Sequence, residues 1–151
     1  MASCSSSPLL SNTHPSPEAL ATAVLGAFER RDTIALNGLV LSEEEFRAHV
    51  WRELPAARPE RNLPFWYVWG DLRQKSDESL RRTLASHGGR RYALVSVRAA
   101  GETTRYPSYT VSRETVLMVR DESGAATELR LFGSTIQKDG GWKVFSYVVD
   151  D

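Results

Sequence analysis

Residues 115–149 read TVLMVRDESGAATELRLFGSTIQKDGGWKVFSYVV, and this stretch decides the fold class of the chain. It contains three runs rich in β-branched, aromatic and aliphatic residues, the types that suit a pleated and half-buried surface: 115–119, 128–132 and 142–149. Two turn sequences separate these runs, 121–124 and 139–141, and both contain the glycine that tight hairpins need. Short turns join antiparallel neighbours, so the stretch predicts a meander of antiparallel strands.

The predicted sheet extends upstream of this stretch. A strand is predicted from Arg91, with Tyr92, Leu94 and Ser96 on one face and Ala93, Val95 and Val97 on the other. A first turn follows at residues 99–104, and a long strand is predicted from about residue 106 to 120. An extended strand of that length would span roughly 50 Å, too long to stay flat, so we expect a bend near Ser112-Arg113. Further on, the apolar phase switches at Gly133, where a β-bulge would fit.

Helical patterns fill the first half of the chain. The Ser-Pro pair at 16–17 is typical of a helix start, and an apolar stripe with helical spacing follows it: Leu20, Val24 and Phe28. Asp32 predicts the cap of a short helix over residues 33–36, which Asn37-Gly38 ends. These residues therefore predict two consecutive helices.

Two further helices are predicted around a proline-rich loop. Ser42 and Glu45 have the spacing of a capping box and begin a helix that Pro55 ends. Residues 55–64 are predicted to be irregular, and the aromatic run Phe65–Trp69 closes on Gly70-Asp71 before a third long helix begins at Ser76. The expected fold is therefore α+β, with N-terminal helices packed on a strongly curved, cone-shaped antiparallel sheet of about four long strands.

Composition excludes several classes of protein. The chain has 151 residues, enough for one domain, and its 19 basic residues equal its 19 acidic residues. Balanced charge without a basic stripe gives no footprint for nucleic acid. No apolar run reaches the length of about 20 residues that a membrane-spanning helix needs. Cys4 is the single cysteine and the three histidines lie far apart in sequence, so neither a metal site nor a cofactor is predicted.

The N-terminus reads as a polar tail followed by one domain. Residues 1–15 are rich in serine and proline and predict a flexible segment, which leaves residues 16–151 as the folded domain. Ala2-Ser3-Cys4 resembles the start of mature bacterial lipoproteins, in which the cysteine is lipidated and a polar linker leads to the domain. The charged and apolar regions that precede this site in the family do not precede it here, so the alternative is a tail with an unmodified thiol.

The order of elements, helices first and then a curved meander, resembles the nuclear transport factor 2-like (cystatin-like) superfamily. Two local sequences carry the resemblance: Phe28–Asp32 at the end of the first helix, and the closing Lys138–Val144 turn and strand. In that superfamily a pocket lies between the sheet and the helices. Its members include isomerases, dehydratases, polyketide cyclases and non-catalytic binding or dimerising modules. The family often places a first strand before the third helix, and Phe65–Trp69 is the candidate for it here.

Two residues are weak candidates for acid–base catalysis. Asp71 follows the aromatic run, and a carboxylate beside apolar rings can have the raised pKa of a general base. His49 lies beside the apolar stripe of its helix, where it can face a pocket. The competing interpretations are structural: Asp71 as a loop or capping residue, and His49 as a packing residue on a helix flank.

Aromatic and strand residues are the candidates for ligand binding. Trp66 and Trp69 can line a pocket or cover the sheet, and both interpretations stay open. Three strand residues with polar tips can point into a cone: Tyr92, Arg130 and Tyr147. Arg130 is the most informative of the three, because burying an unpaired guanidinium is costly; the alternative is an exposed or interface position.

The sequence favours a non-catalytic module that binds a small apolar ligand or a protein partner. The alternatives are an isomerase- or cyclase-like enzyme acting by proton transfer, and a structural dimerisation domain. Strands with apolar residues on both faces predict a homodimer packed through the outer face of the sheet. The lipoprotein resemblance implies a lipid-anchored location in the bacterial cell envelope, with a cytoplasmic location as the alternative.

Overall fold

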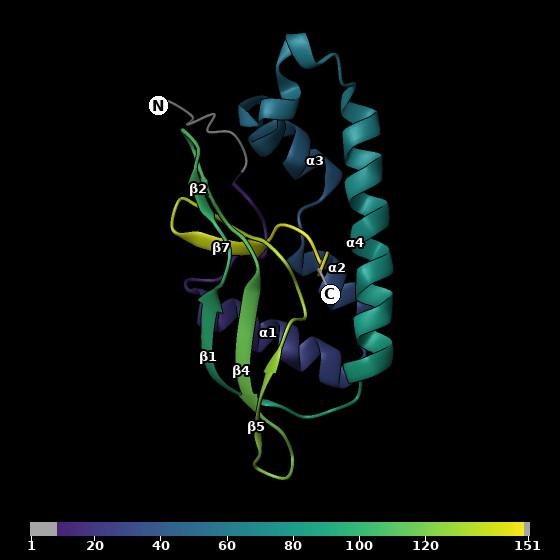
Figure 1. The fold of residues 1–151 in the computed structure, drawn as a ribbon, viewed down its shortest axis with the longest axis vertical. Coiled ribbons are helices and arrows are strands. Elements are labelled where there is room, and N and C mark those ends of the chain that lie inside the picture. The colour runs from purple at the N-terminus through teal and green to yellow at the C-terminus, as the bar shows by residue number, and fades with distance from the viewer. Residues whose placement is uncertain (1–8, 150–151) are drawn as a thin grey trace, which may run out of the picture.

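The structure, a computed structural model, describes residues 9–149 and places the helices before the strands, which confirms the α+β class (Figure 1). The helical elements are α1 (Pro17–Arg30), α2 (Thr33–Leu39), α3 (Glu43–Glu45), the short turns η1 (Phe46–Val50), η2 (Trp51–Glu53), η3 (Pro55–Ala57) and η4 (Pro59–Arg61), and α4 (Phe65–His87). The strands are β1 (Ala93–Ala99), β2 (Thr103–Arg105), β3 (Thr110–Ser112), β4 (Thr115–Arg120), β5 (Ala126–Leu129), β6 (Thr135–Lys138) and β7 (Gly141–Val144).

The predicted helix caps are confirmed. The hydroxyl of Ser16 accepts a hydrogen bond from the Ala19 amide at 3.0 Å, and Asp32 accepts one from the Ala35 amide at 3.0 Å. Both contacts satisfy an amide that the first helical turn leaves without an intrahelical partner. α2 does not end at Asn37-Gly38 as predicted but continues through Leu39, whose side chain is buried.

The capping box at Ser42 and Glu45 is also confirmed, but the helix after it is irregular. α3 is a single turn, η1 widens into a π-turn, and η2 tightens into a 3₁₀ turn. The carbonyl of Val50, where the widened turn ends, accepts a hydrogen bond from the buried Tyr109 hydroxyl at 2.7 Å. A tertiary hydrogen bond thus supports the departure from α-helical geometry.

Residues 65–87 form one continuous helix, so the predicted break at Gly70-Asp71 and the predicted start at Ser76 are both wrong. The aromatic run is the first turn of α4 and supplies no strand. A stripe at helical spacing explains the continuity: Phe65, Trp69, Leu72, Ser76 and Leu80 all face the interior. Gly70 lies on the opposite face, where a glycine weakens a helix by only about 1 kcal/mol.

The strands form two antiparallel sheets, not the single, strongly curved sheet of four long strands that the sequence predicts. One sheet has the order β1-β4-β5 and the other the order β2-β3-β6-β7. The predicted strand at 106–120 is divided into β3 and β4, and the predicted bend near Ser112-Arg113 coincides with that division. Glu114 has a φ of 56° there, a left-handed conformation that turns the chain between the two sheets.

The last predicted strand ends early, because the chain leaves the sheet after Val144 and runs along α4. The Ser76 hydroxyl accepts a hydrogen bond from the Tyr147 amide at 2.9 Å, and the Ser79 hydroxyl accepts one from the Val149 amide at 3.1 Å. Gly133, where the chain passes from β5 to β6, donates its amide to the Ser146 carbonyl at 3.1 Å. A Cβ at Gly133 would overlap the Val148 carbonyl oxygen. We call residues 145–149 the C-terminal segment.

Two apolar clusters form the core. The α1 cluster packs β1-β4-β5 against α1 and α2, with Phe28, Leu117, Phe132 and Tyr147 among its buried members. The aromatic cluster packs β3 and β6 against η1, η2 and the start of α4, with Phe46, Trp69, Tyr109 and Ile136 among its buried members. Of the apolar residues in 142–149, Trp142, Val144 and Tyr147 pack in the α1 cluster and Phe145 packs in the aromatic cluster.

Residues 10–14 lie in the stretch predicted to be flexible, but they pack onto the domain. Leu10 is buried, and the backbone of His14 pairs with Trp142 beside β7. The Lys143 ammonium donates to the Ser11 carbonyl at 2.6 Å and to Glu45 at 2.8 Å. This ion pair is buried, with the Lys143 side chain 2% exposed and the Glu45 side chain 11% exposed. Cys4 lies outside the described residues.

Candidate functional site

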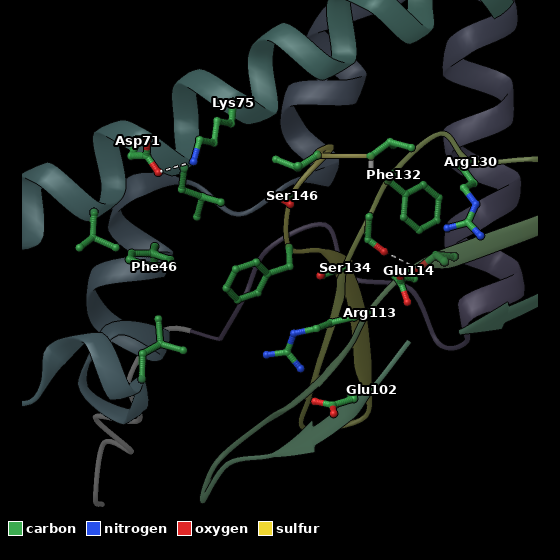
Figure 2. A pocket seen from close by; sticks show the side chains of 18 residues that line it. Phe46, Asp71, Lys75, Glu102, Arg113, Glu114, Arg130, Phe132, Ser134 and Ser146 are labelled. Atoms are coloured by element: carbon green, nitrogen blue, oxygen red, sulfur yellow. Dashed lines mark hydrogen bonds and ion pairs between the residues drawn. The ribbon is translucent and has the colours of Figure 1, made fainter. Parts of the chain in front are cut away.

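A cavity of about 720 Å³ lies between α4, the C-terminal segment and the junction of the two sheets (Figure 2). Cavities of this size accommodate small organic ligands. Apolar side chains from every surrounding element form much of its wall: Phe46, Leu54, Val68, Leu72, Phe132, Phe145 and Val148. We call it the α4 cavity.

Two facing walls carry the charged residues of the α4 cavity. On α4, Lys75 and Asp71 form an ion pair at 3.0 Å, with both side chains more than half exposed. On the side of the sheets lie Arg113 and Glu102, and Arg130 lies at one end, near Phe132 (Figure 2). Together with Glu114, the lining therefore holds as many basic as acidic side chains.

Arg113 is the most constrained cation of this lining. One guanidinium nitrogen donates to the Thr104 hydroxyl at 2.7 Å, which ties the side chain to β2. Among residues 9–149, neither Arg113 nor Arg130 forms an ion pair with an acidic side chain. Guanidinium groups without a carboxylate partner keep donors free for a polar group of a ligand.

A second cavity, of about 680 Å³, adjoins the first along α4. Three residues line both cavities and therefore mark the boundary: Glu114, Arg130 and Val149. The remaining lining comes from the C-terminal half of α4: Ser79, Arg82, Thr83, Ser86 and His87. We call it the polar cavity, since Val149 is the only aliphatic residue among those that line it.

His87 at the end of α4 is oriented by a neighbouring ring. Its Nδ1 lies 3.1 Å from the Tyr92 hydroxyl, and the two rings meet edge to face. Burial, with a smaller contribution from the nearby Arg90 charge, lowers the pKa of His87 below its ordinary value. The imidazole is therefore neutral at pH 7, when it acts as one donor and one acceptor.

Of the residues that the sequence suggests for a site, the α4 cavity brings together Asp71 and Arg130. Trp66 is 73% exposed on the first turn of α4 and does not line that cavity, while Trp69 is buried in the aromatic cluster. His49 lies at a smaller cavity beside Glu53 and Ser108, away from Asp71.

The two tyrosines among those candidates have structural contacts. Tyr147 is buried in the α1 cluster, and its hydroxyl donates to the Leu36 carbonyl. Burial raises the pKa of Tyr147 above its ordinary value, so the hydroxyl stays protonated. Tyr92 packs against the same cluster and contacts His87.

Several lining residues escape sequence reasoning. Phe132 and Phe145 look like ordinary strand residues, and only the departure of the C-terminal segment toward α4 places them at a cavity. Arg82 and His87 lie on a helix that the sequence predicts, but only the tertiary packing of α4 brings them to the same cavity as Arg130. Among these lining residues, only Arg113 has a feature in the sequence that points to the site, its position beside the bend expected near Ser112-Arg113.

No family model, curated protein or solved structure matches this chain. Among residues 9–149, no group of three or more histidine, cysteine, aspartate or glutamate side chains could hold a metal ion. The geometry of the two cavities is therefore the basis for any functional conclusion.

Proposed function

We propose that the chain is a non-catalytic module that binds a small, largely apolar ligand in the α4 cavity. The observation that carries the proposal is the cavity itself, a space of about 720 Å³ walled by aromatic and aliphatic side chains from both core clusters. A space between secondary-structure layers, with an apolar lining and a few polar groups, is the usual form of a ligand site.

The apolar wall is held in place by core packing. Phe46 and Phe132 are each 1% exposed, so their rings belong to the core as well as to the wall. The Phe46 ring contacts Phe65, Trp69 and Phe145, with centroid distances of 5.8, 5.2 and 6.2 Å. A rigid wall lowers the entropy cost of binding, because few side chains have to be ordered by the ligand.

The lining of the α4 cavity favours binding over proton transfer. Its titratable residues are carboxylates, lysine and arginines, and neither a histidine nor a tyrosine lines it. Asp71 is occupied by Lys75 and exposed, which is a poor environment for a general base. The enzyme hypothesis keeps one supporting observation, the His87–Tyr92 contact at the polar cavity. The enzyme hypothesis would be supported by a turnover that is measured in the unmodified protein and is lost in a His87→Gln variant.

A cavity-filling substitution tests the binding proposal. Leu72→Trp adds bulk to a residue that lines the α4 cavity from α4, and Gln74→Trp adds the same bulk to an exposed position of the same helix. We expect an uncharged fluorescent naphthylamine to bind the unmodified protein and the Gln74→Trp variant. Leu72→Trp should weaken that binding at least about tenfold, a change of roughly 1.4 kcal/mol.

Circular dichroism and thermal unfolding of both variants provide the control for folding. If Leu72→Trp keeps its melting temperature and still binds the probe as tightly as Gln74→Trp, the ligand site lies elsewhere. If no variant and not even the unmodified protein binds any uncharged probe, the binding function itself is wrong.

We also propose a superfamily for this fold. The arrangement of helices, divided sheet and α4 cavity is proposed to be related to the nuclear transport factor 2-like superfamily.

We further propose that Cys4 is the lipid attachment site of a protein of the bacterial cell envelope. Among residues 9–149 no helix is long and apolar enough to cross a membrane. Metabolic labelling with a radioactive fatty acid, lost in a Cys4→Ser variant, would support the anchor; an unlabelled native protein would contradict it.

A homodimer is proposed as well, through the outer face of β1-β4-β5. Val95 on β1 is 53% exposed and is an apolar residue on the surface of this sheet. Arg98 and Glu128 are exposed polar residues of the same sheet and form an ion pair at 2.7 Å. Trp142, Val144, Phe145 and Tyr147 pack in the core clusters and do not add to this surface. Sedimentation equilibrium distinguishes a dimer from a monomer whose mass does not change with concentration.

A further inference from the structure

We propose that the polar cavity binds the anionic group of an amphipathic ligand, whose apolar part occupies the α4 cavity. This inference rests on the proposed function and adds to it the chemical class of the ligand: an apolar chain or ring system that carries a carboxylate or a phosphate. The argument starts from the position of Arg130, which lines both cavities and so faces both parts of such a ligand.

The charges of the two cavities differ. The α4 cavity is balanced, with three basic and three acidic side chains: Lys75, Arg113 and Arg130 against Asp71, Glu102 and Glu114. Among residues 9–149, the lining of the polar cavity has Arg82 and Arg130 against Glu114, an excess of positive charge. An anionic group therefore gains more in the polar cavity.

The donors of the polar cavity suit an oxyanion. Among residues 9–149, Arg82 forms no ion pair with an acidic side chain, as is also the case for Arg130. Two guanidinium groups can bind a carboxylate or a phosphate through paired N–H donors. Ser86 and the neutral His87 add uncharged donors along the same wall of α4, whereas the Thr83 hydroxyl donates within the helix to the carbonyls of Ser79 and Leu80.

Among the lining residues that the structure describes, Glu114 is the acidic side chain that opposes an anion. Its side chain covers Gly101, where an added Cβ would lie 2.5 Å from a Glu114 carboxylate oxygen. Its φ of 56° is costly for glutamate and is better tolerated by asparagine. Glu114→Asn therefore removes the charge with no added backbone strain, and it should strengthen the binding of an anion.

Three ligands of equal chain length separate the two parts of the proposal: decanol, decanoate and decyl phosphate, each titrated by calorimetry below its aggregation concentration. Decanol reports the α4 cavity alone. We expect the unmodified protein to bind at least one of the two anions more than about tenfold more tightly than decanol, since a charge-assisted hydrogen bond contributes that much or more. The stronger of the two identifies a carboxylate or a phosphate as the natural group.

Adjacent arginines on α4 supply a matched pair of variants. Arg82 lines the polar cavity, whereas Arg81 lines neither cavity and is exposed. Arg82→Met and Arg130→Met should each reduce the preference for the anion about tenfold, and Arg82→Met, whose residue does not line the α4 cavity, should leave decanol binding unchanged. Arg81→Met should leave the preference intact, which excludes a general loss of positive charge as the cause.

The outcomes distinguish the inference from the function on which it rests. Equal binding of decanol and both anions would overturn the inference and leave the apolar site standing. A preference that survives in both the Arg82→Met and Arg130→Met variants, but is lost in Arg113→Met, would place the anion in the α4 cavity and also overturn it. Failure of all three ligands to bind would overturn the proposed function, and the inference with it.

Discussion

The two core clusters of this protein pack similar sheets in different ways. In the α1 cluster, a capped regular helix lies on β1-β4-β5, and its core is mainly aliphatic. In the aromatic cluster, a π-turn, a 3₁₀ turn and the start of α4 cover β3 and β6, and rings of Phe46, Trp51 and Phe65 contact one another. The comparison shows two ways to cover a sheet: a regular helix with aliphatic side chains, and an irregular chain whose large rings contact one another.

The clusters also differ in how they use charge. The ion pair of the sheet on the α1 side, Arg98–Glu128, has both side chains more than half exposed. The ion pair on the aromatic side, Lys143–Glu45, is buried and also holds the N-terminal segment through Ser11. Exposed pairs contribute little to stability, whereas a buried pair is costly to break. The α4 cavity lies between the two clusters, and each cluster supplies part of its wall.

The largest expected effect breaks the buried pair. Lys143→Met leaves Glu45 as an uncompensated buried charge and removes the donor to the Ser11 carbonyl. We expect the free energy of unfolding at pH 7 to fall by about 3–5 kcal/mol, measured by urea denaturation. Arg98→Met, in the exposed pair of the other sheet, should change it by only about 0–1 kcal/mol.

A double variant sharpens the same comparison. Glu45→Leu combined with Lys143→Met removes both charges and should recover much of the lost stability, because no charge is then left buried. Equal losses in Lys143→Met and Arg98→Met would contradict the distinction between the two halves.

A smaller effect is expected where the two halves meet. Gly133→Ala places a methyl group against the Val148 carbonyl oxygen, and backbone atoms cannot move aside as a flexible side chain can. The C-terminal segment must shift, and overpacking of this kind costs about 1–3 kcal/mol. The shift should also weaken ligand binding, since Val148 lines the α4 cavity. Gly124→Ala is the control: it has open space, and its φ of 85° gives a strain that leaves the cavity untouched.

The sequence predicts those features of the fold that depend on neighbouring residues. The caps at Ser16, Asp32 and Ser42 are confirmed, because a capping side chain bonds an amide only a few residues away. The turn at Asp139-Gly140 is confirmed for the same reason: both residues have a positive φ, as a two-residue hairpin requires.

Features that depend on distant partners escape prediction. Ser76 looks like a helix start, yet it lies within α4 and bonds the Tyr147 amide from the far end of the chain. The sequence predicts a last strand that continues to Val149. In the structure, the amides of Tyr147 and Val149 donate to the hydroxyls of Ser76 and Ser79 on α4 and not to a neighbouring strand. The site follows the same rule. Asp71 and Arg130 can be chosen one at a time, whereas their meeting at one cavity depends on where the C-terminal segment runs.

The smallest expected effect is a difference in the pH at which each half begins to lose stability. On the α1 side, burial and Arg90 lower the pKa of His87 below 6.5, so the unfolded chain binds a proton there before the folded chain does. Stability should therefore start to fall as the pH drops below about 6.5. His87 is partly exposed, so solvent screening keeps this loss small.

On the aromatic side, burial tends to raise the pKa of Glu45, but hydrogen bonds from Lys143, Ser42 and Ser11 outweigh it and hold the pKa below 4.5. The stability that Glu45 contributes is thus present above pH 4.5 and is lost as the pH falls through the lower folded value. Urea denaturation between pH 7 and pH 3 should show a shallow decline that His87→Gln removes and a later one that Glu45→Gln removes. A decline below pH 4.5 that is as steep in Glu45→Gln as in the unmodified protein would assign the acid sensitivity to carboxylates outside the buried pair.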